Sequence, residues 1–493
     1  MTRLRHQTRA ALLLFLGFSL LYVAISRGVF LYGDDILMFQ VTEGLVERGG
    51  PAVTSPSDEA DVARSIPGRD GKNYAKYGIG QSLVAIPAYV VSDIVVRPLL
   101  PLVEIHDAHG NLRTGTQVWG VGLTSAVAGG ATVALTFLLA LAAGYSQRTA
   151  YVLAALLGGA TLLAHYSATF LSEPLSALCL VLVVYGLLRA SSAAEPQRWL
   201  WLSGFAAGFG IAVKVASGVT LLAPGLWLLW LAWQRRRAWR RAVLMLVAWG
   251  TPIAGWLALV AAYNWVRFGA VTETGYGGEA RQYTTPFLTG VEGLLISPGK
   301  GVLWYSPPLF LALAGSWWFA RRKPALALVI FGVVAATVTL YARYYQWYGG
   351  GVWGTRFLVP VLPLLLLPAG EIIERARRGN RAAVAGVAAA ALLGVYVTIL
   401  GIAVPFDRYI AEASVSPEAW DATLWKIDAS PLVIHARRLD DDLTDPDIAA
   451  VRYDSTRLLA VSASTSLLGL VAVVGGYLTP PPHSREERRA LRE

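Results

Sequence analysis

The 493-residue chain has a single cysteine, Cys179, and few charged residues, at 15% of the total. One cysteine excludes an intramolecular disulfide and a cysteine-based metal site. The sequence also lacks a Walker-type phosphate loop, a dinucleotide-binding glycine motif and a His-Glu zinc motif. We therefore expect no nucleotide or flavin cofactor, and the energy for any reaction must arrive with the substrate.

Hydrophobic residues dominate the chain, at 55% of the total with a mean hydropathy of +0.50. This balance exceeds that of a soluble domain and predicts an all-α polytopic integral membrane protein. Stretches apolar enough to cross about 30 Å of hydrocarbon predict about twelve spans, near residues 9–30, 117–143, 148–166, 171–189, 199–214, 217–233, 242–263, 302–320, 325–341, 355–372, 382–404 and 456–478.

The net charge of +10 comes from arginines in short loops between apolar stretches, which is the positive-inside pattern and requires no nucleic acid partner. The basic start of the chain predicts a cytoplasmic N-terminus. The same side should hold the basic runs at 234–241, 321–323 and 374–381 and the tail at 484–493. In this membrane topology, the segments outside the cytoplasm are residues 31–116, 167–172, 264–301, 342–354 and 405–455.

One apolar stretch, 77–100, cannot be a full crossing in this threading, because the residues on both sides of it must be outside. Pro87 and Pro98 interrupt it, and Asp93 and Arg97 stand among its apolar residues. These features favour an interfacial helix. The alternative is a true span with a shifted topology.

The domain prediction is a single membrane domain over residues 1–478. It contains a first outer loop at 31–116 with interfacial helices and an outer polar loop at 405–455, and a basic cytoplasmic tail follows at 479–493.

Two adjacent acids, Asp34 and Asp35, follow the first predicted span directly. Carboxylates at a membrane boundary usually face water, a partner or a substrate path. The alternative is that both are solvated loop acids that cap the next helix.

Several sequence blocks resemble the membrane-embedded C-type (GT-C) glycosyltransferases, a superfamily that includes protein O-mannosyltransferases and lipid A aminoarabinose transferases. The first blocks are "GDD" with the amphipathic helix after it (33–46), "GKNYAKYGIGQSLVAIPAY" (71–89) and "HYSATFLSEPLSALCLVL" (165–182). Three later blocks resemble a bacterial branch of the superfamily: "YNWVRFGAVTETGYGG" (263–278), "GLLISPGKGVLWYSPPLF" (293–310) and "WYGGGVWGTRFLVPVLPLL" (347–365).

This resemblance spans most of the chain and implies a GT-C-like fold in a bacterial plasma membrane. It also implies a sugar donor carried on a polyprenyl phosphate. The sugar would pass to an extracytoplasmic glycan, lipid or protein acceptor, usually with inversion at the anomeric carbon.

The resemblance further assigns roles to three acids. Asp34 and Asp35 match the acidic pair of the family, and a general base must accept the proton of the acceptor hydroxyl. Neighbouring residues point in different directions, so one carboxylate would act as the base while the other binds metal or holds the loop. The position in the family motif favours Asp34 as the base, with Asp35 as the alternative. Glu173 matches a second acidic position of the family. Asp35 and Glu173 are the candidate ligands for Mg²⁺ or Mn²⁺, although Glu173 is also explained as a carboxylate at a helix N-terminus.

Cations on the predicted outer side are candidates for binding the leaving phosphate. Lys76 and Arg356 match family patterns, Lys72 replaces Lys76 if the loop register differs, and Lys214 and Lys300 lie at the same predicted level. Interface anchoring is the alternative for each of them.

Two other functions fit the same composition. A flippase for a lipid-linked saccharide would also use many spans, but repeated halves are common in transporters and we find no similarity between residues 1–245 and 246–493. A non-catalytic, lipid-binding family member is the third possibility.

Overall fold

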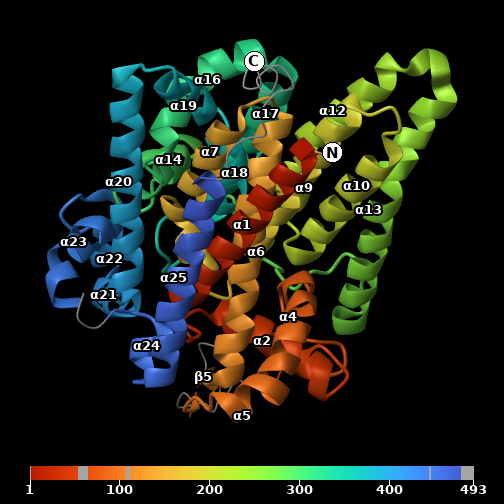
Figure 1. Cartoon of the computed structure of the whole chain (residues 1–493). Helices are drawn as coiled ribbons and strands as arrows, with labels where there is room; N and C mark the ends of the chain where they lie inside the picture. Colours follow the sequence, from red (N-terminus) through yellow and green to blue (C-terminus); the bar gives the residue numbers. More distant parts are fainter. Residues whose placement is uncertain (1, 54–64, 107–111, 443–445, 479–493) are drawn as a thin grey trace.

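Helices make up most of the computed structural model, which describes residues 2–53, 65–106, 112–442 and 446–478 (Figure 1). Within those ranges, eight helices are long and apolar enough to cross a membrane, or up to nine if a bent pair is one span. The predicted all-α membrane class is confirmed, whereas the count of twelve spans is not. Four predicted spans contain helices of only 13 to 17 residues: α7 (Gln147–Gly159), α10 (Gln197–Val213), α12 (Leu222–Gln234) and α16 (Leu309–Arg322).

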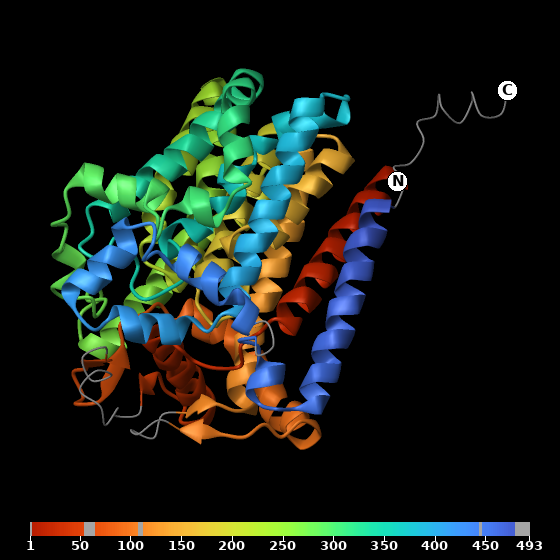
Figure 2. The ribbon, with the colours of Figure 1, turned by 90° about the vertical axis from the view of Figure 1, so that its left-hand side faces the viewer.

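The long helices satisfy their own backbone hydrogen bonds, as the hydrocarbon of a bilayer requires. They are α1 (Thr2–Ala24), α6 (Thr116–Ala142), α9 (Glu173–Ser192), α13 (Trp239–Phe268), α17 (Pro324–Ala342), α20 (Arg381–Ala403) and α25 (Thr456–Leu478). Helix α6 packs against both α1 and α9, and α10 packs against α9 and α13. The first and last helices, α1 and α25, lie side by side although they are at opposite ends of the chain (Figure 2).

The bent pair runs from Arg356 to Arg377 and turns by 43°. It consists of η4 (Arg356–Val361), α18 (Leu362–Leu366) and α19 (Ala369–Arg377). Pro360 lies inside η4, Pro363 lies in the first turn of α18, and Pro368 precedes α19. Proline removes a backbone donor and clashes with the preceding turn, so this span is broken where its prolines lie.

Basic loops and the first outer segment occupy opposite ends of the helix bundle (Figure 1). The upper end in the figure holds the connection between α12 and α13, which includes η2 (Arg236–Ala238), and the turns before α17 and α20. The lower end holds α2 (Gly33–Glu47), α4 (Gly80–Val91) and α5 (Arg97–Leu99). This arrangement agrees with the predicted threading; the tail at 479–493 lies outside the described residues.

The first outer segment contains two small antiparallel sheets. Strand β3 (Asn73–Ala75) lies between β1 (Ala52–Val53) and β2 (Ser65–Pro67), and β4 (Ile105–His106) pairs with β5 (Leu112–Thr114). Helix α4 packs on α2 and continues through the π-helical turn η1 (Ser92–Val96) into α5. By length and composition Gly80–Leu99 could also cross a membrane, so its predicted interfacial position stays a prediction.

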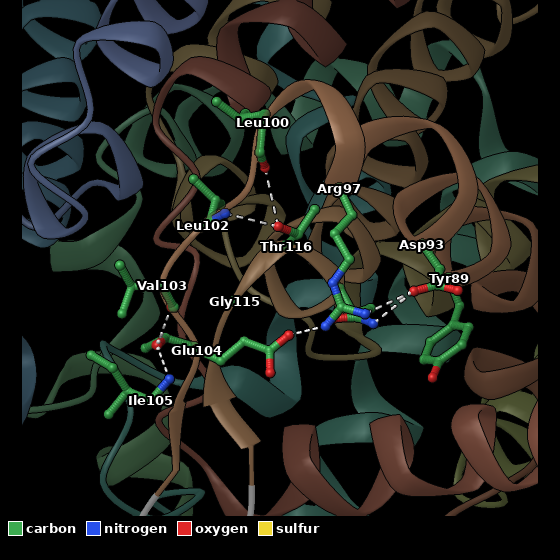
Figure 3. Close-up of polar contacts among 12 residues, drawn as sticks. Tyr89, Asp93, Arg97, Leu100, Leu102, Val103, Glu104, Ile105, Gly115 and Thr116 are labelled. Carbon is green, nitrogen blue, oxygen red and sulfur yellow. Dashed lines mark hydrogen bonds and ion pairs between the residues drawn. The ribbon is translucent and has the colours of Figure 1, made fainter.

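Polar contacts fasten the segment between α5 and β4 to the start of α6 (Figure 3). The Thr116 hydroxyl accepts a hydrogen bond from the Leu102 amide at 3.0 Å and donates one to the Leu100 carbonyl at 3.1 Å. Arg97 contacts Asp93 at 3.1 Å and also pairs with Glu104. These contacts hold the chain that follows α5 in a fixed position over the bundle.

The segment 405–455 was predicted to be a polar loop, and its described part is instead largely helical. It contains α21 (Phe406–Ala413), α22 (Pro417–Trp425), α23 (Pro431–Asp442) and α24 (Ala449–Arg452). Phe406 and His435 are buried and pack their rings against Trp353. The predicted position of this segment outside the membrane stays a prediction.

The remaining helices are short and join the long ones. They are α8 (Leu162–Ser167), α11 (Ser217–Thr220), η3 (Glu279–Arg281), α14 (Phe287–Ile296) and α15 (Val302–Tyr305).

Candidate active site

A cavity of about 560 Å³ brings together parts of the chain that are far apart in sequence. Its lining residues come from the chain entering α2, from the residue pair after β3, from η3, from the glycine-rich stretch before η4, and from α21. Three of the predicted site residues, Asp34, Lys76 and Arg356, line it directly. The cavity therefore contains both a predicted acid and two predicted cations.

Asp34 lies in the first turn of α2 and uses both carboxylate oxygens. Its Oδ1 accepts a hydrogen bond from the Tyr77 hydroxyl at 2.6 Å, and its Oδ2 contacts Nη2 of Arg356 at 2.6 Å. Burial disfavours the charged form, but the Arg356 charge and the Tyr77 hydrogen bond outweigh it and lower the pKa of Asp34 to about 2. Asp34 is therefore ionised at neutral pH.

Asp35 has a different environment, although it is the next residue. Its side chain is buried at 1% exposure, and Asp35 is not among the residues that line the cavity. Burial, followed by the neighbouring charge of Asp34, raises the pKa of Asp35 well above its ordinary value. The environments of the two acids thus shift their pKa values in opposite directions, and Asp34, whose pKa is lowered, faces the cavity.

Glu173 joins two cations at the start of α9, where the helix dipole also favours a carboxylate. Its Oε1 accepts hydrogen bonds from Nζ of Lys214 and from Nε of Arg356, both at 3.0 Å. The Glu173 side chain has no exposed surface. Asp34, Arg356, Glu173 and Lys214 therefore form a continuous chain of two acids and two cations, whose charges compensate each other in a buried site.

The position of Arg356 depends on a glycine in the stretch before η4. Gly349 has a φ of +75°, and a Cβ added to it would lie 2.7 Å from Cγ of Arg356. Only glycine fits both the left-handed backbone and the close approach of this side chain. The glycine-rich stretch therefore leaves room for the arginine that bridges the two acids.

Lys76 extends into the cavity directly after β3 and contacts Glu279 of η3. Its Nζ lies 2.7 Å and 2.9 Å from the two carboxylate oxygens of Glu279. Buried Arg267 donates a hydrogen bond to the carbonyl of Ala75 and so fixes the end of the strand that carries Lys76. Lys72, the alternative to Lys76, is exposed and lies 3.8 Å from Asp70, so the structure does not bring it into the cavity.

Lys300 lies behind the cavity wall. Its Nζ donates hydrogen bonds to the carbonyls of Gly350, at 2.9 Å, and of Val352, and both of these residues line the cavity. Burial, followed by the charge of Arg356, lowers the pKa of Lys300 to about 7. In this geometry Lys300 supports the glycine-rich stretch, whereas Lys76 and Arg356 reach the cavity.

The predicted Mg²⁺ or Mn²⁺ site at Asp35 and Glu173 stays a prediction. Each carboxylate has one buried oxygen without a hydrogen-bond partner, Oδ1 of Asp35 and Oε2 of Glu173. Among the described residues, however, no group of three or more His, Cys, Asp or Glu side chains is arranged to hold a metal ion. Mg²⁺ is commonly held by one or two carboxylates together with water molecules, so Asp35 and Glu173 are the residues that would hold it.

Sequence reasoning did not select two of the residues that complete the site, Tyr77 and Glu279. Tyr77 follows Lys76 in the block "YAKYG", so its position next to a candidate cation was the only available signal. Glu279 lies in "GYGGEA", 203 residues after its partner Lys76. No local pattern in the sequence indicates that contact.

Comparisons with known proteins agree with this architecture. Residues 101–270 match the family model described as dolichyl-phosphate-mannose-protein mannosyltransferase. A curated relative, the undecaprenyl phosphate-alpha-4-amino-4-deoxy-L-arabinose arabinosyl transferase of Pseudomonas aeruginosa (strain UCBPP-PA14), is 27% identical over 299 residues. The match covers 57% of this chain and 50% of the relative, so the chain spans about half the length of that protein.

The fold is also similar to a solved structure. The crystal structure of ArnT from Cupriavidus metallidurans bound to undecaprenyl phosphate aligns with a TM-score of 0.53 at 15% identity. The alignment covers 95% of this chain and 77% of that chain. This structure confirms the predicted helical membrane fold. The family model and the curated relative confirm the predicted resemblance to protein O-mannosyltransferases and aminoarabinose transferases.

Proposed function

We propose that this protein is a glycosyltransferase that moves a sugar from a polyprenyl-phosphate donor to an extracytoplasmic acceptor. The observation that carries the proposal is the cavity in which ionised Asp34 lies beside two cations, Arg356 and Lys76. Such a site offers a base for an incoming hydroxyl and positive charge for a departing phosphate. The similarity to a transferase that is named for undecaprenyl phosphate gives the same donor class.

The reaction is a single displacement. The acceptor oxygen attacks the anomeric carbon while its proton passes to the Asp34 carboxylate. The bond between the anomeric carbon and the phosphate oxygen breaks, and its electron pair stays on that oxygen. Lys76 and Arg356 stabilise the charge that develops on the phosphate. One displacement inverts the anomeric configuration.

Arg356 couples donor binding to the strength of the base. With the cavity empty of donor, the Arg356 guanidinium contacts Asp34 at 2.6 Å and is the main attractive charge that keeps the pKa of Asp34 low. A carboxylate with so low a pKa is a weak base. A donor phosphate that draws Arg356 away raises the pKa of Asp34 and makes it a better proton acceptor when the donor is in place.

The proposal includes an orientation and partners. Asp34, which lines the cavity, belongs to α2, and α2 lies at the end of the bundle opposite the basic loops (Figure 1). Together with the positive-inside rule, this supports a cavity on the extracytoplasmic side of a bacterial plasma membrane with both termini in the cytoplasm. The donor arrives from the bilayer. The acceptor is a glycan, a lipid or a protein that presents a hydroxyl or amine on that side.

The experiment is transfer by the purified full chain in lipid nanodiscs, with radiolabelled polyprenyl-phosphate sugars and a membrane extract as acceptor. We expect wild type to transfer label from at least one donor and Asp34→Asn to transfer it about 10²- to 10⁴-fold more slowly. The same assay with EDTA, then with added Mg²⁺ or Mn²⁺, tests the predicted metal. If donors bind without transfer, and vesicles show movement of the lipid across the bilayer, the protein is a flippase instead.

A further inference from the structure

Every cation of the site already has a carboxylate partner before any substrate binds. Arg356 contacts Asp34 and Glu173, Lys214 contacts Glu173, and Lys76 contacts Glu279. An incoming phosphate must therefore displace at least one protein carboxylate from a cation. The question is which carboxylate is released most easily.

Glu279 is the acid that leaves at the lowest cost. Its side chain is 34% exposed, whereas the Asp34 side chain is less exposed, at 21%, and the side chain of Glu173 has no exposed surface. A buried carboxylate that loses its partners keeps an uncompensated charge in a low-dielectric site, while a partly exposed one is rehydrated. Glu279 also belongs to the short helix η3 in a connecting segment, and Glu173 begins a long packed helix.

A second cavity provides space for the released side chain. This cavity, of about 740 Å³, is lined by Glu279 but not by Lys76, and Arg69 is among its other lining residues. The Arg69 guanidinium lies 4.0 Å from the ring centroid of Trp265 and offers a positive charge on that side. Glu279 thus stands in the wall between two cavities, with a cation on each side.

We propose that the Glu279 carboxylate is an internal competitor for the phosphate of the lipid donor, and that the Lys76–Glu279 pair opens when the donor binds. This inference rests on the proposed function. Glu279 holds Lys76 in position and neutralises it while the cavity is empty. The donor phosphate then replaces the carboxylate on Lys76, and Glu279 turns toward the second cavity.

The same competition assists product release. The donor is a phosphodiester with one negative charge, whereas the product is a phosphate monoester that carries about −1.5 to −2 at pH 7. The product would therefore bind Lys76 and Arg356 more tightly than the donor does. Return of Glu279 to Lys76 counteracts that attraction and lets the lipid phosphate leave.

The test measures binding of undecaprenyl phosphate to the full chain in nanodiscs, for wild type, Glu279→Gln, Glu273→Gln and Lys76→Gln. Glu273 lines the second cavity on the same segment and accepts a hydrogen bond from the Gly275 amide at 2.8 Å, so it is a matched control. Undecaprenol, which lacks the phosphate, isolates the contribution of the charge.

We expect Glu279→Gln to bind undecaprenyl phosphate about three- to fivefold more tightly than wild type, the range set by a partly exposed ion pair. Glu273→Gln should bind like wild type, Lys76→Gln should bind more weakly, and undecaprenol should not distinguish Glu279→Gln from wild type. In turnover, Glu279→Gln should lower both the KM for the donor and kcat, because product release becomes slow.

Three results would overturn the inference. Unchanged or weaker binding by Glu279→Gln, with Lys76→Gln still impaired, would show that Glu279 does not compete with the phosphate and would leave the proposed function intact. If Glu279→Gln bound undecaprenol more tightly than wild type by the same factor, the effect would come from the lipid chain and not from the phosphate. Absence of undecaprenyl phosphate binding by wild type would refute the proposed function itself. If Glu279→Gln does not fold, Glu279→Asp tests the same competition, because its shorter side chain weakens the contact with Lys76.

Discussion

Asp34→Asn removes the proposed base while it keeps the size of the side chain. The amide oxygen can still accept the hydrogen bond that the Tyr77 hydroxyl donates to Oδ1, and only the ion pair to Arg356 is lost. A positioned general base contributes about 10²- to 10⁴-fold to a rate. At about 1.4 kcal/mol per factor of ten, this corresponds to roughly 3 to 5.5 kcal/mol in the activation barrier. We expect the transfer rate to fall by that factor.

Donor affinity should not fall with the rate. The wild-type chain of two acids and two cations is formally neutral, and the variant leaves Glu173 as one acid against Arg356 and Lys214. The excess positive charge favours an incoming phosphate. A single-turnover rate measured with saturating donor, together with the donor Kd, should therefore show slower chemistry with equal or tighter binding.

Asp70→Asn is the control for this prediction. Asp70 lies in the same outer segment, is partly exposed, and contacts Lys72 at 3.8 Å outside the cavity. Its variant should keep the wild-type rate. A rate for Asp34→Asn within tenfold of wild type would place the base elsewhere. Loss of donor binding together with the rate would mean that Asp34 holds the cations in place and is not the base.

Three further predictions follow from the same geometry. The pKa of Asp34 is lowered to about 2, so the stabilising charge of Asp34 is present above about pH 4 and is lost as the pH falls through 2. The difference in melting temperature between wild type and Asp34→Asn should therefore shrink from pH 5 to pH 2. The pKa of Asp35 is raised, so at pH 7 folding must either protonate this carboxylate or bury its charge, and either costs free energy. Asp35→Asn should therefore melt at the same temperature as wild type or at a higher one. A large fall in melting temperature would contradict this. Gly349→Ala should slow transfer by displacing Arg356. Gly71→Ala, with a similar φ of +78°, no atom near its Cβ and a position outside the cavity, measures the effect of backbone strain alone.

The sequence allowed the positions of several site residues to be predicted because charges at the ends of apolar stretches are few. Asp34, Glu173, Lys214 and Arg356 each stand next to a predicted span, and the positive-inside threading put all four on one side of the membrane. Charged residues on the same side of the membrane and at the same depth can be expected to contact each other. The ion pairs among them agree with that prediction, while their roles in catalysis are untested.

Contacts that depend on the path of a connecting segment could not be predicted. Lys76 meets Glu279 because η3 folds back over the end of β3, and nothing in either block encodes that path. Lys300 was predicted on the same side of the membrane as the other cations, but its side chain donates hydrogen bonds to two backbone carbonyls in the cavity wall. The count of twelve spans is not confirmed for a related reason, because four of the predicted spans contain helices of only 13 to 17 residues.

Under the proposed function, the carboxylates that already contact the cations affect which phosphate ligands the site accepts. A phosphate that competes with carboxylates fixed at 2.6 to 3.0 Å from Arg356 and Lys76 gains little from charge alone, because it exchanges one ion pair for another. Net affinity must then come from other parts of the ligand. A prenyl chain provides an advantage by anchoring the head group in the membrane, because keeping each CH₂ group out of water is worth about 0.8 kcal/mol and the donor is thereby concentrated beside the cavity. The internal carboxylates would thus exclude soluble phosphates and sugar phosphates, which lack such an anchor, and admit the same head group when a lipid delivers it from the bilayer.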